Sequence, residues 1–124
     1  MVKRLDTILC QVLDMNRACS FYRDVLGLTP GVQSPYWSDF DLGGVKIGLH
    51  PPFVAGPGRP DAGWIVGFEV DKLLDLHGEL GQAGVKVGAF HDVPGGVVLE
   101  FSDPDGNALQ AIQRGTTKAE LIPA

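Results

Sequence analysis

The sequence predicts one α+β domain in which two similar halves fold around a shared concave surface. Three observations predict this fold. The chain has 124 residues, a usual length for one domain. Its 17 Gly and 9 Pro are spread along the chain, which indicates many tight turns between short elements. The order strand, helix, strand and hairpin occurs twice, so two units can place helices on one sheet face and leave the other face for a cavity.

The first half, residues 1–50, carries clear signals for a helix and a hairpin. Asp14 is the predicted N-cap of the helix and Gly27 its end. Apolar residues alternate on both sides of two adjacent glycines, which predicts a hairpin. The predicted elements are a strand at 7–12, a helix from 14 to 27, an irregular edge segment between Pro30 and Pro35, and hairpin strands at 37–42 and 45–49.

The second half, residues 64–112, repeats this order after a linker at 51–63 that is rich in Pro and Gly and has no periodicity. Asp71 is the predicted N-cap of its helix, which ends at Gly84. The predicted strands are 64–70, 85–90, 97–101 and 108–112, and the last two are joined by a turn sequence at 103–107. Residues 113–124 are expected to form a polar, loosely ordered tail.

The charge, the apolar segments and the cysteines of the chain indicate which kinds of partner and which cell compartment to expect. The net charge is −5 and the chain has no basic block, which argues against a nucleic-acid partner. No apolar segment has the length of a signal peptide core or a membrane span. Cys10 and Cys19 are expected to be reduced core residues of a cytoplasmic protein, although a disulfide between them stays open.

Three motifs resemble the vicinal oxygen chelate superfamily, which includes glyoxalase I, extradiol dioxygenases, fosfomycin-resistance transferases and bleomycin-resistance proteins. The motifs are Val12-Leu13-Asp14 followed by the segment 19–28, Phe40-Asp41-Leu42-Gly43-Gly44, and Phe101-Ser102-Asp103-Pro104-Asp105-Gly106-Asn107. The resemblance implies two βαβββ modules with curved mixed sheets that enclose a concave cavity, with helices on the outer face. It also implies a homodimer, in which the modules pair either within a chain or across a swapped dimer.

Metal-dependent members of this superfamily hold a divalent ion through four strand residues. Carried over to this chain, the four positions are Thr7, Gly48, Trp64 and Gln110, with Ile65 as the third position if the register is one residue later. None of these side chains is a good ligand for a divalent ion. We therefore expect no metal and no cofactor, as in the bleomycin-resistance branch.

Strand alternation predicts which residues face the cavity. The uniformly apolar phase should pack on the helices, and the mixed phase should line a small-molecule pocket. The predicted ligand-binding residues are Trp37, Asp39, His50, Trp64, Phe68, Glu100 and Gln110. No catalytic residue is predicted, because no nucleophile and base have supporting context.

Several of these residues have two interpretations. Trp64 forms either a stacking wall for a planar ligand or a plug in the vacated metal position. Glu100 either orients a cationic or hydroxylated ligand, acts as a base, or pairs with Lys46 or Arg114. His50 fits a solvated strand end better than a base, and a displaced metal cluster of Asp39, His50 and Glu100 lacks a recognised ligand spacing.

The sequence thus favours a metal-free protein that binds a small, partly aromatic organic molecule, with sequestration of a drug or metabolite as its most concrete form. The first alternative is a lyase, isomerase or dioxygenase of the glyoxalase type that uses a relocated metal or Glu100 as base. The second alternative is an interaction domain whose cavity is plugged by Trp64 and Trp37.

Overall fold

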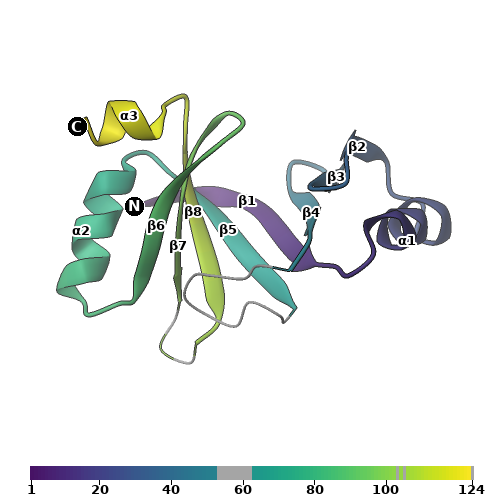
Figure 1. The fold of residues 1–124 in the computed structure, drawn as a ribbon, viewed down its shortest axis with the longest axis horizontal. Helices are drawn as coiled ribbons and strands as arrows, with labels where there is room; N and C mark the ends of the chain where they lie inside the picture. The colour runs from purple at the N-terminus through teal and green to yellow at the C-terminus, as the bar shows by residue number, and fades with distance from the viewer. Residues whose placement is uncertain (53–62, 103, 105, 124) are drawn as a thin grey trace.

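The computed structural model describes residues 1–52, 63–102, 104 and 106–123. One mixed sheet runs through the molecule, and helices α1 and α2 lie at its opposite ends (Figure 1). The elements are β1 (Val2–Gln11), α1 (Met15–Ser20), the π-helical turn η1 (Phe21–Val25), β2 (Pro30–Gln33), β3 (Ser38–Asp41), β4 (Lys46–His50), β5 (Trp64–Val70), α2 (Leu73–Gln82), β6 (Val87–Val93), β7 (Gly96–Ser102), β8 (Ala108–Arg114) and α3 (Lys118–Leu121).

The eight strands lie in the order β2-β3-β4-β1-β5-β8-β7-β6, so each half of the chain forms one half of the sheet. In each half the first strand pairs in parallel with the last, β1 with β4 and β5 with β8. Antiparallel pairing of β1 with β5 joins the halves and places Leu9 opposite Ile65. The predicted α+β fold with two βαβββ-like halves is confirmed, and the halves pair within one chain.

Local signals in the first half act as predicted. The Asp14 carboxylate accepts a hydrogen bond from the Arg17 backbone N–H at 3.0 Å and caps α1. The helix continues into η1 and the chain turns at Gly27, whose φ is 72°. Gly43 and Gly44, with φ of 71° and 98°, turn the chain between β3 and β4. Residues with a Cβ rarely adopt these φ values, which explains why glycine occupies these three positions.

Three local predictions need correction. The N-cap of α2 is Lys72 and not Asp71, and the Leu73 N–H instead donates to Oε1 of Gln113 from β8 at 2.8 Å. The segment after Pro30 is an edge strand, β2. The expected loose tail contains α3, because Thr117 caps this helix and Asp92 of β6 accepts the Lys118 N–H at 2.8 Å. Most of the predicted linker and two residues of the 103–107 turn lie outside the described residues.

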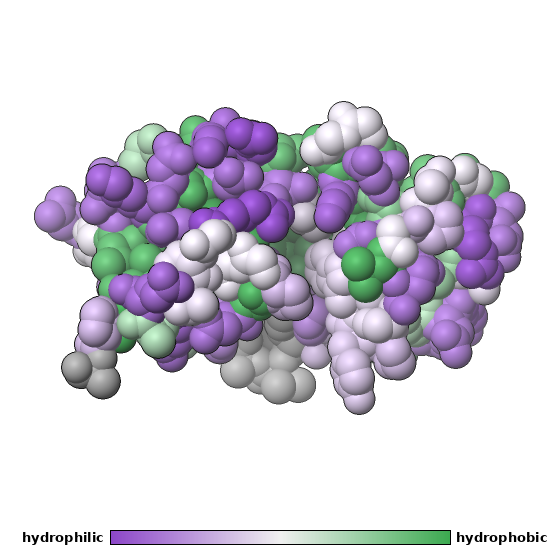
Figure 2. Space-filling view, turned by 90° about the horizontal axis from the view of Figure 1, so that it is seen from above, coloured by the Kyte–Doolittle hydropathy of each residue, from purple (hydrophilic) through white to green (hydrophobic). Residues whose placement is uncertain are grey.

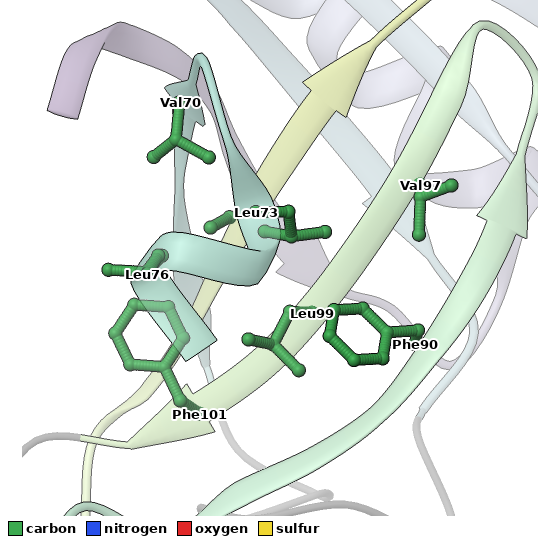
Figure 3. Packing of buried hydrophobic residues seen from close by; sticks show 8 residues of the cluster. Val70, Leu73, Leu76, Phe90, Val97, Leu99 and Phe101 are labelled. Carbon is green, nitrogen blue, oxygen red and sulfur yellow. The ribbon is translucent and has the colours of Figure 1, made fainter. Parts of the chain in front are cut away.

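Each half has its own hydrophobic core. In the first half, Cys19 of α1 packs with Phe40 of β3 and Leu49 of β4, and Cys10 contacts this cluster. Burial raises the pKa of the Cys10 thiol, which fits a packing role better than a nucleophilic one. The core of the second half lies between α2 and strands β5 to β8 (Figure 3).

Among the described residues, no helix is long and apolar enough to cross a membrane.

The core under α2 gives a matched pair of variants. Leu73 is fully buried, whereas its neighbour Leu74 is 44% exposed. We expect Leu73→Ala to lower the free energy of unfolding by about 2–5 kcal/mol, because it leaves a cavity in the core. Leu74→Ala should cost less than about 1 kcal/mol. Urea denaturation of both variants measures the difference, and equal losses would contradict this packing.

Candidate functional site

The sheet face opposite the helices, here called the inner face, is defined by strand register. Leu99 and Phe101 of β7 pack in the core under α2, so Val98 and Glu100 face the other way. Cross-strand pairing extends this assignment from strand to strand. By this register the inner face carries Thr7, Leu9, Gln11, Asp39, Lys46, Gly48, His50, Ile65, Gly67, Glu69, His91, Val98, Glu100, Gln110, Ile112 and Arg114. Seen from above, the surface is hollowed between the two halves, and hydrophobic residues are visible inside the hollow (Figure 2).

Register decides which residue of β5 occupies the third of the four family metal positions. Leu9 pairs with both Gly48 and Ile65, so these three side-chain positions share the inner face. Trp64 instead pairs with Cys10, whose side chain belongs to the core under α1. The expectation that Trp64 occupies this position is therefore wrong, and Ile65 stands there.

Phe68 needs the same correction. It pairs with Ala111, which belongs to the core under α2, so Phe68 faces the outer side of the sheet with Trp64. The error has a physical cause. Strand β5 is apolar at almost every position, so alternation of apolar and polar residues could not show which phase faces the cavity.

The residues at the four positions do not fit a divalent ion. Ile65 has no donor atom, and the Gln110 amide is a weak ligand. The Thr7 hydroxyl donates to the Asp6 carboxylate at 2.9 Å. A Cβ on Gly48 would overlap the ring of Trp37, lying 2.7 Å from Cζ2 and 2.9 Å from Cζ3. An aromatic ring thus covers the second ligand position.

The Trp37 ring is held in place by Asp39. This carboxylate is only 4% exposed, and both of its oxygens have internal partners. Oδ2 accepts the Trp37 Nε1–H at 2.7 Å, and Oδ1 accepts the Val32 backbone N–H at 2.9 Å. A Cβ on Gly31 would collide with the same carboxylate. Asp39, predicted as a ligand contact, therefore positions the indole ring.

The alternative metal cluster of Asp39, His50 and Glu100 does not form. Among the described residues, no group of three or more His, Cys, Asp or Glu side chains is placed to hold a metal ion. His50 does lie on the inner face, opposite Gln11, and its Nδ1 is 2.5 Å from the Pro51 carbonyl oxygen. This short contact orients the imidazole ring along the end of β4.

Glu100 and Gln110 face each other across β7 and β8 on the inner face, as predicted. Gly67 of β5 lies on the other side of Gln110. Both polar side chains are half-buried. The alternative ion pair of Glu100 with Lys46 or Arg114 is not formed among the described residues.

Arg114 has other partners, at the end of the inner face where β1, β5 and β8 meet. It contacts the Asp6 carboxylate, and its Nε lies 3.7 Å from the Glu69 carboxylate. Lys3 lies 3.4 Å from Glu69 and 3.2 Å from Asp71. The hydrogen bond and charge of Asp71, followed by those of Glu69, raise the pKa of Lys3. These charges neutralise one another, and Glu100 takes no part in this cluster.

Two features of the site escaped sequence reasoning. Ile65 was considered only as an alternative, and the close approach of the Thr7 backbone to Gly67 was missed. A glycine inside a strand does signal a close backbone approach. A Cβ on Gly67 would lie 3.2 Å from the Thr7 carbonyl oxygen, which is such an approach.

Comparisons with known proteins agree with this architecture. A family model described as Glyoxalase/Bleomycin resistance protein/Dioxygenase superfamily matches residues 4–111. No match was found among the curated proteins.

Solved structures show the same fold at low sequence identity. Methylmalonyl-CoA epimerase from Mycobacterium tuberculosis is 15% identical, with a TM-score of 0.73 over 93% of this chain and 90% of the other. NAD-dependent benzaldehyde dehydrogenase from Legionella pneumophila is 20% identical, with a TM-score of 0.70 over 88% and 98%. A glyoxalase/bleomycin resistance protein/dioxygenase superfamily member from Vibrio splendidus 12B01 is 19% identical, with a TM-score of 0.65 over 89% and 97%. These likenesses concern the fold alone.

The contact of Trp37 with Gly48 predicts the effect of one added methyl group. We expect Gly48→Ala to destabilise the protein by about 1–3 kcal/mol, because the new Cβ overlaps the indole ring. In a Trp37→Ala background the same change should cost close to nothing. Urea denaturation of the four proteins gives this coupling as a double-mutant cycle.

Gly78→Ala is the matched control for this cycle. Gly78 lies within α2, and a Cβ there would meet nothing within 4 Å. Alanine at this position should stabilise the helix by about 0.5–1 kcal/mol. An equal cost of Gly48→Ala with and without the Trp37 ring would show that the ring does not cover Gly48.

Proposed function

We propose that this chain, which belongs to the Glyoxalase/Bleomycin resistance protein/Dioxygenase superfamily, binds a small, partly aromatic organic molecule on its inner face without a metal ion. One observation carries the proposal. The four family metal positions hold Thr7, Gly48, Ile65 and Gln110, and the Trp37 ring lies over Gly48. The small molecule would bind at the place where the family resemblance implies a pocket. The side chains at the four positions there cannot coordinate a metal well.

The chemistry of the inner face supports a ligand with a flat apolar part. Leu9, Ile65 and Ile112 supply apolar surface, and the hydrogen bond to Asp39 fixes the orientation of the Trp37 ring. A fixed aromatic ring binds a planar group without losing side-chain freedom on binding. Glu100 and Gln110 add two polar groups, and a few polar groups in an apolar lining are typical of small-molecule sites.

In its most concrete form, this function is sequestration of a drug or an aromatic metabolite, in the manner of the bleomycin-resistance branch. Sequestration requires only tight and selective binding. No described group of side chains supplies a metal centre, and neither oxygen of Asp39 is free to act as a base. Binding is therefore the activity that the residues of the inner face support best.

We also propose that two copies associate through the outer face of the central strands. Helix α1 packs chiefly on β4, and α2 chiefly on β6 and β8, so neither helix packs chiefly on β1 or β5. Trp64 there is 49% exposed and Leu5 is 36% exposed, while Phe68 is half-buried. A two-fold dimer buries the same patch of both copies against each other, and an exposed apolar patch between the two helices is suited to such an interface.

The binding proposal predicts thermal stabilisation by at least one member of a panel of antibiotics and aromatic metabolites. A ligand at a hundredfold excess over its Kd stabilises the folded state by about 2.7 kcal/mol, which differential scanning fluorimetry detects. We expect Trp37→Ala to weaken binding of that compound roughly tenfold. Phe21→Ala, which removes an exposed aromatic ring from η1, should leave the affinity within about twofold.

The same preparation separates binding from metal chemistry. Elemental analysis of protein purified without chelators should find no stoichiometric Ni, Zn, Fe or Mn. Stoichiometric metal would overturn the metal-free function in favour of a glyoxalase-type enzyme. An unchanged thermal midpoint across the panel would count against the binding function itself.

The dimer predicts a mass of about twice 13.2 kDa in size-exclusion chromatography with light scattering. Trp64→Glu should shift the protein to the monomer mass, because it places a charge in the apolar patch. Tyr36→Glu is the matched control, since Tyr36 is 77% exposed and lies in the turn before β3. A monomeric wild type would refute this dimer.

A further inference from the structure

We infer that the ligand of the inner face carries a cationic nitrogen group, such as an amidinium or a protonated amine, and that Glu100 binds it. This inference rests on the proposed binding function and specifies the class of ligand. It follows from the position of a single carboxylate among the strands of the second half.

The described neighbours of Glu100 on its own strand and on the paired strand β8 are uncharged. Gln110 lies directly opposite it on β8, flanked by Ala108 and Ile112. Val98 and Ser102 precede and follow it on the same face of β7. On β6, the residues opposite this part of β7 lie between Val87 and Phe90 and are glycine and alanine. Two groups that can carry a positive charge lie diagonal to these positions, His91 opposite Val98 and Lys86 before β6, and among the described residues neither forms an ion pair with Glu100. The half-buried carboxylate thus has uncharged direct neighbours.

The two basic residues weighed as partners of Glu100 are placed elsewhere. Arg114, the nearest basic residue along β8, contacts Asp6 and Glu69. Lys46 lies opposite Thr7 at the far side of β1, separated from β7 by three strands. Among the residues that the structure describes, Glu100 makes no hydrogen bond and no ion pair.

Such a carboxylate has an energetic consequence. Strands disfavour Glu, and partial burial of a charge without a partner is costly. Asp39 on the same face shows the usual solution, in which two N–H groups donate to a buried carboxylate. No described N–H group donates to Glu100. A ligand with N–H donors and a positive charge would therefore supply the hydrogen bonds and the ion pair that this carboxylate lacks.

The neighbours of Glu100 favour a planar cation with several N–H groups. An amidinium donates two parallel hydrogen bonds to one carboxylate. The Gln110 side chain, directly opposite Glu100, adds an amide oxygen that can accept a further N–H. A ligand that joins such a group to an aromatic ring would use both the polar and the apolar parts of the inner face.

Three probes with one ring system and different charge test this inference: 2-naphthamidine, 2-naphthamide and 2-naphthoate. Isothermal titration calorimetry should give the tightest binding for the amidine, weaker binding for the neutral amide and the weakest for the carboxylate. Glu100→Gln should weaken amidine binding roughly ten- to a hundredfold, the usual range for a hydrogen bond to a charged group, and leave amide binding within about threefold.

Glu79→Gln is the matched control, because it removes the same charge from the exposed surface of α2. It should leave the affinity for the amidine unchanged, and circular dichroism of both variants checks that they fold. Amide binding that equals or exceeds amidine binding, or an unchanged amidine affinity in Glu100→Gln, would overturn the cationic ligand while leaving the binding function intact. If none of the three probes and no panel compound binds, the binding function fails and this inference fails with it.

Discussion

Strands β1 and β5 hydrogen-bond to each other in the middle of the sheet, and this pairing determines which side chains of the two halves share the inner face. Leu9 opposite Ile65 sets the phase for both halves. Side chains alternate along a strand, so a slip of one residue would bring Trp64 to the inner face and bury Ile65 on the other side. The same register, carried through Gly67, places Gln110 and Glu100 on the same face of the sheet as Leu9 and Ile65.

Two carboxylates on the inner face illustrate two uses of the same group. Asp39 is nearly inaccessible, and its oxygens accept N–H groups from β2 and from the indole ring, so it builds the aromatic surface. Glu100 has no such partners among the described residues, and its direct neighbours on β7 and β8 are uncharged. The first carboxylate stabilises the fold, and the second is the group to which we propose that the ligand binds. Their different surroundings, and not their residue type, assign these roles.

Much of this molecule could be predicted from its sequence. The start of the first helix and the hairpin turn depend on local signals, the Asp14 cap and the paired glycines 43 and 44. Both elements were therefore predicted correctly. The phase of β5 could not be predicted, because a strand that is apolar on both faces contains no alternation signal. The cap supplied by Gln113 and the contact of Trp37 with Gly48 join residues far apart in the chain or on different strands, and only the folded register brings them together.

The contact between Trp37 and Gly48 also bears on how this sequence can evolve. A single change that placed a carboxylate at position 48 would not begin to rebuild a metal centre, because the new side chain would collide with the indole ring. The ring would have to be lost first, and its loss would leave the buried Asp39 without one of its two hydrogen-bond donors. Each intermediate step is thus less stable than its starting point. The Trp37 ring therefore opposes any single substitution that would return a metal ligand to position 48.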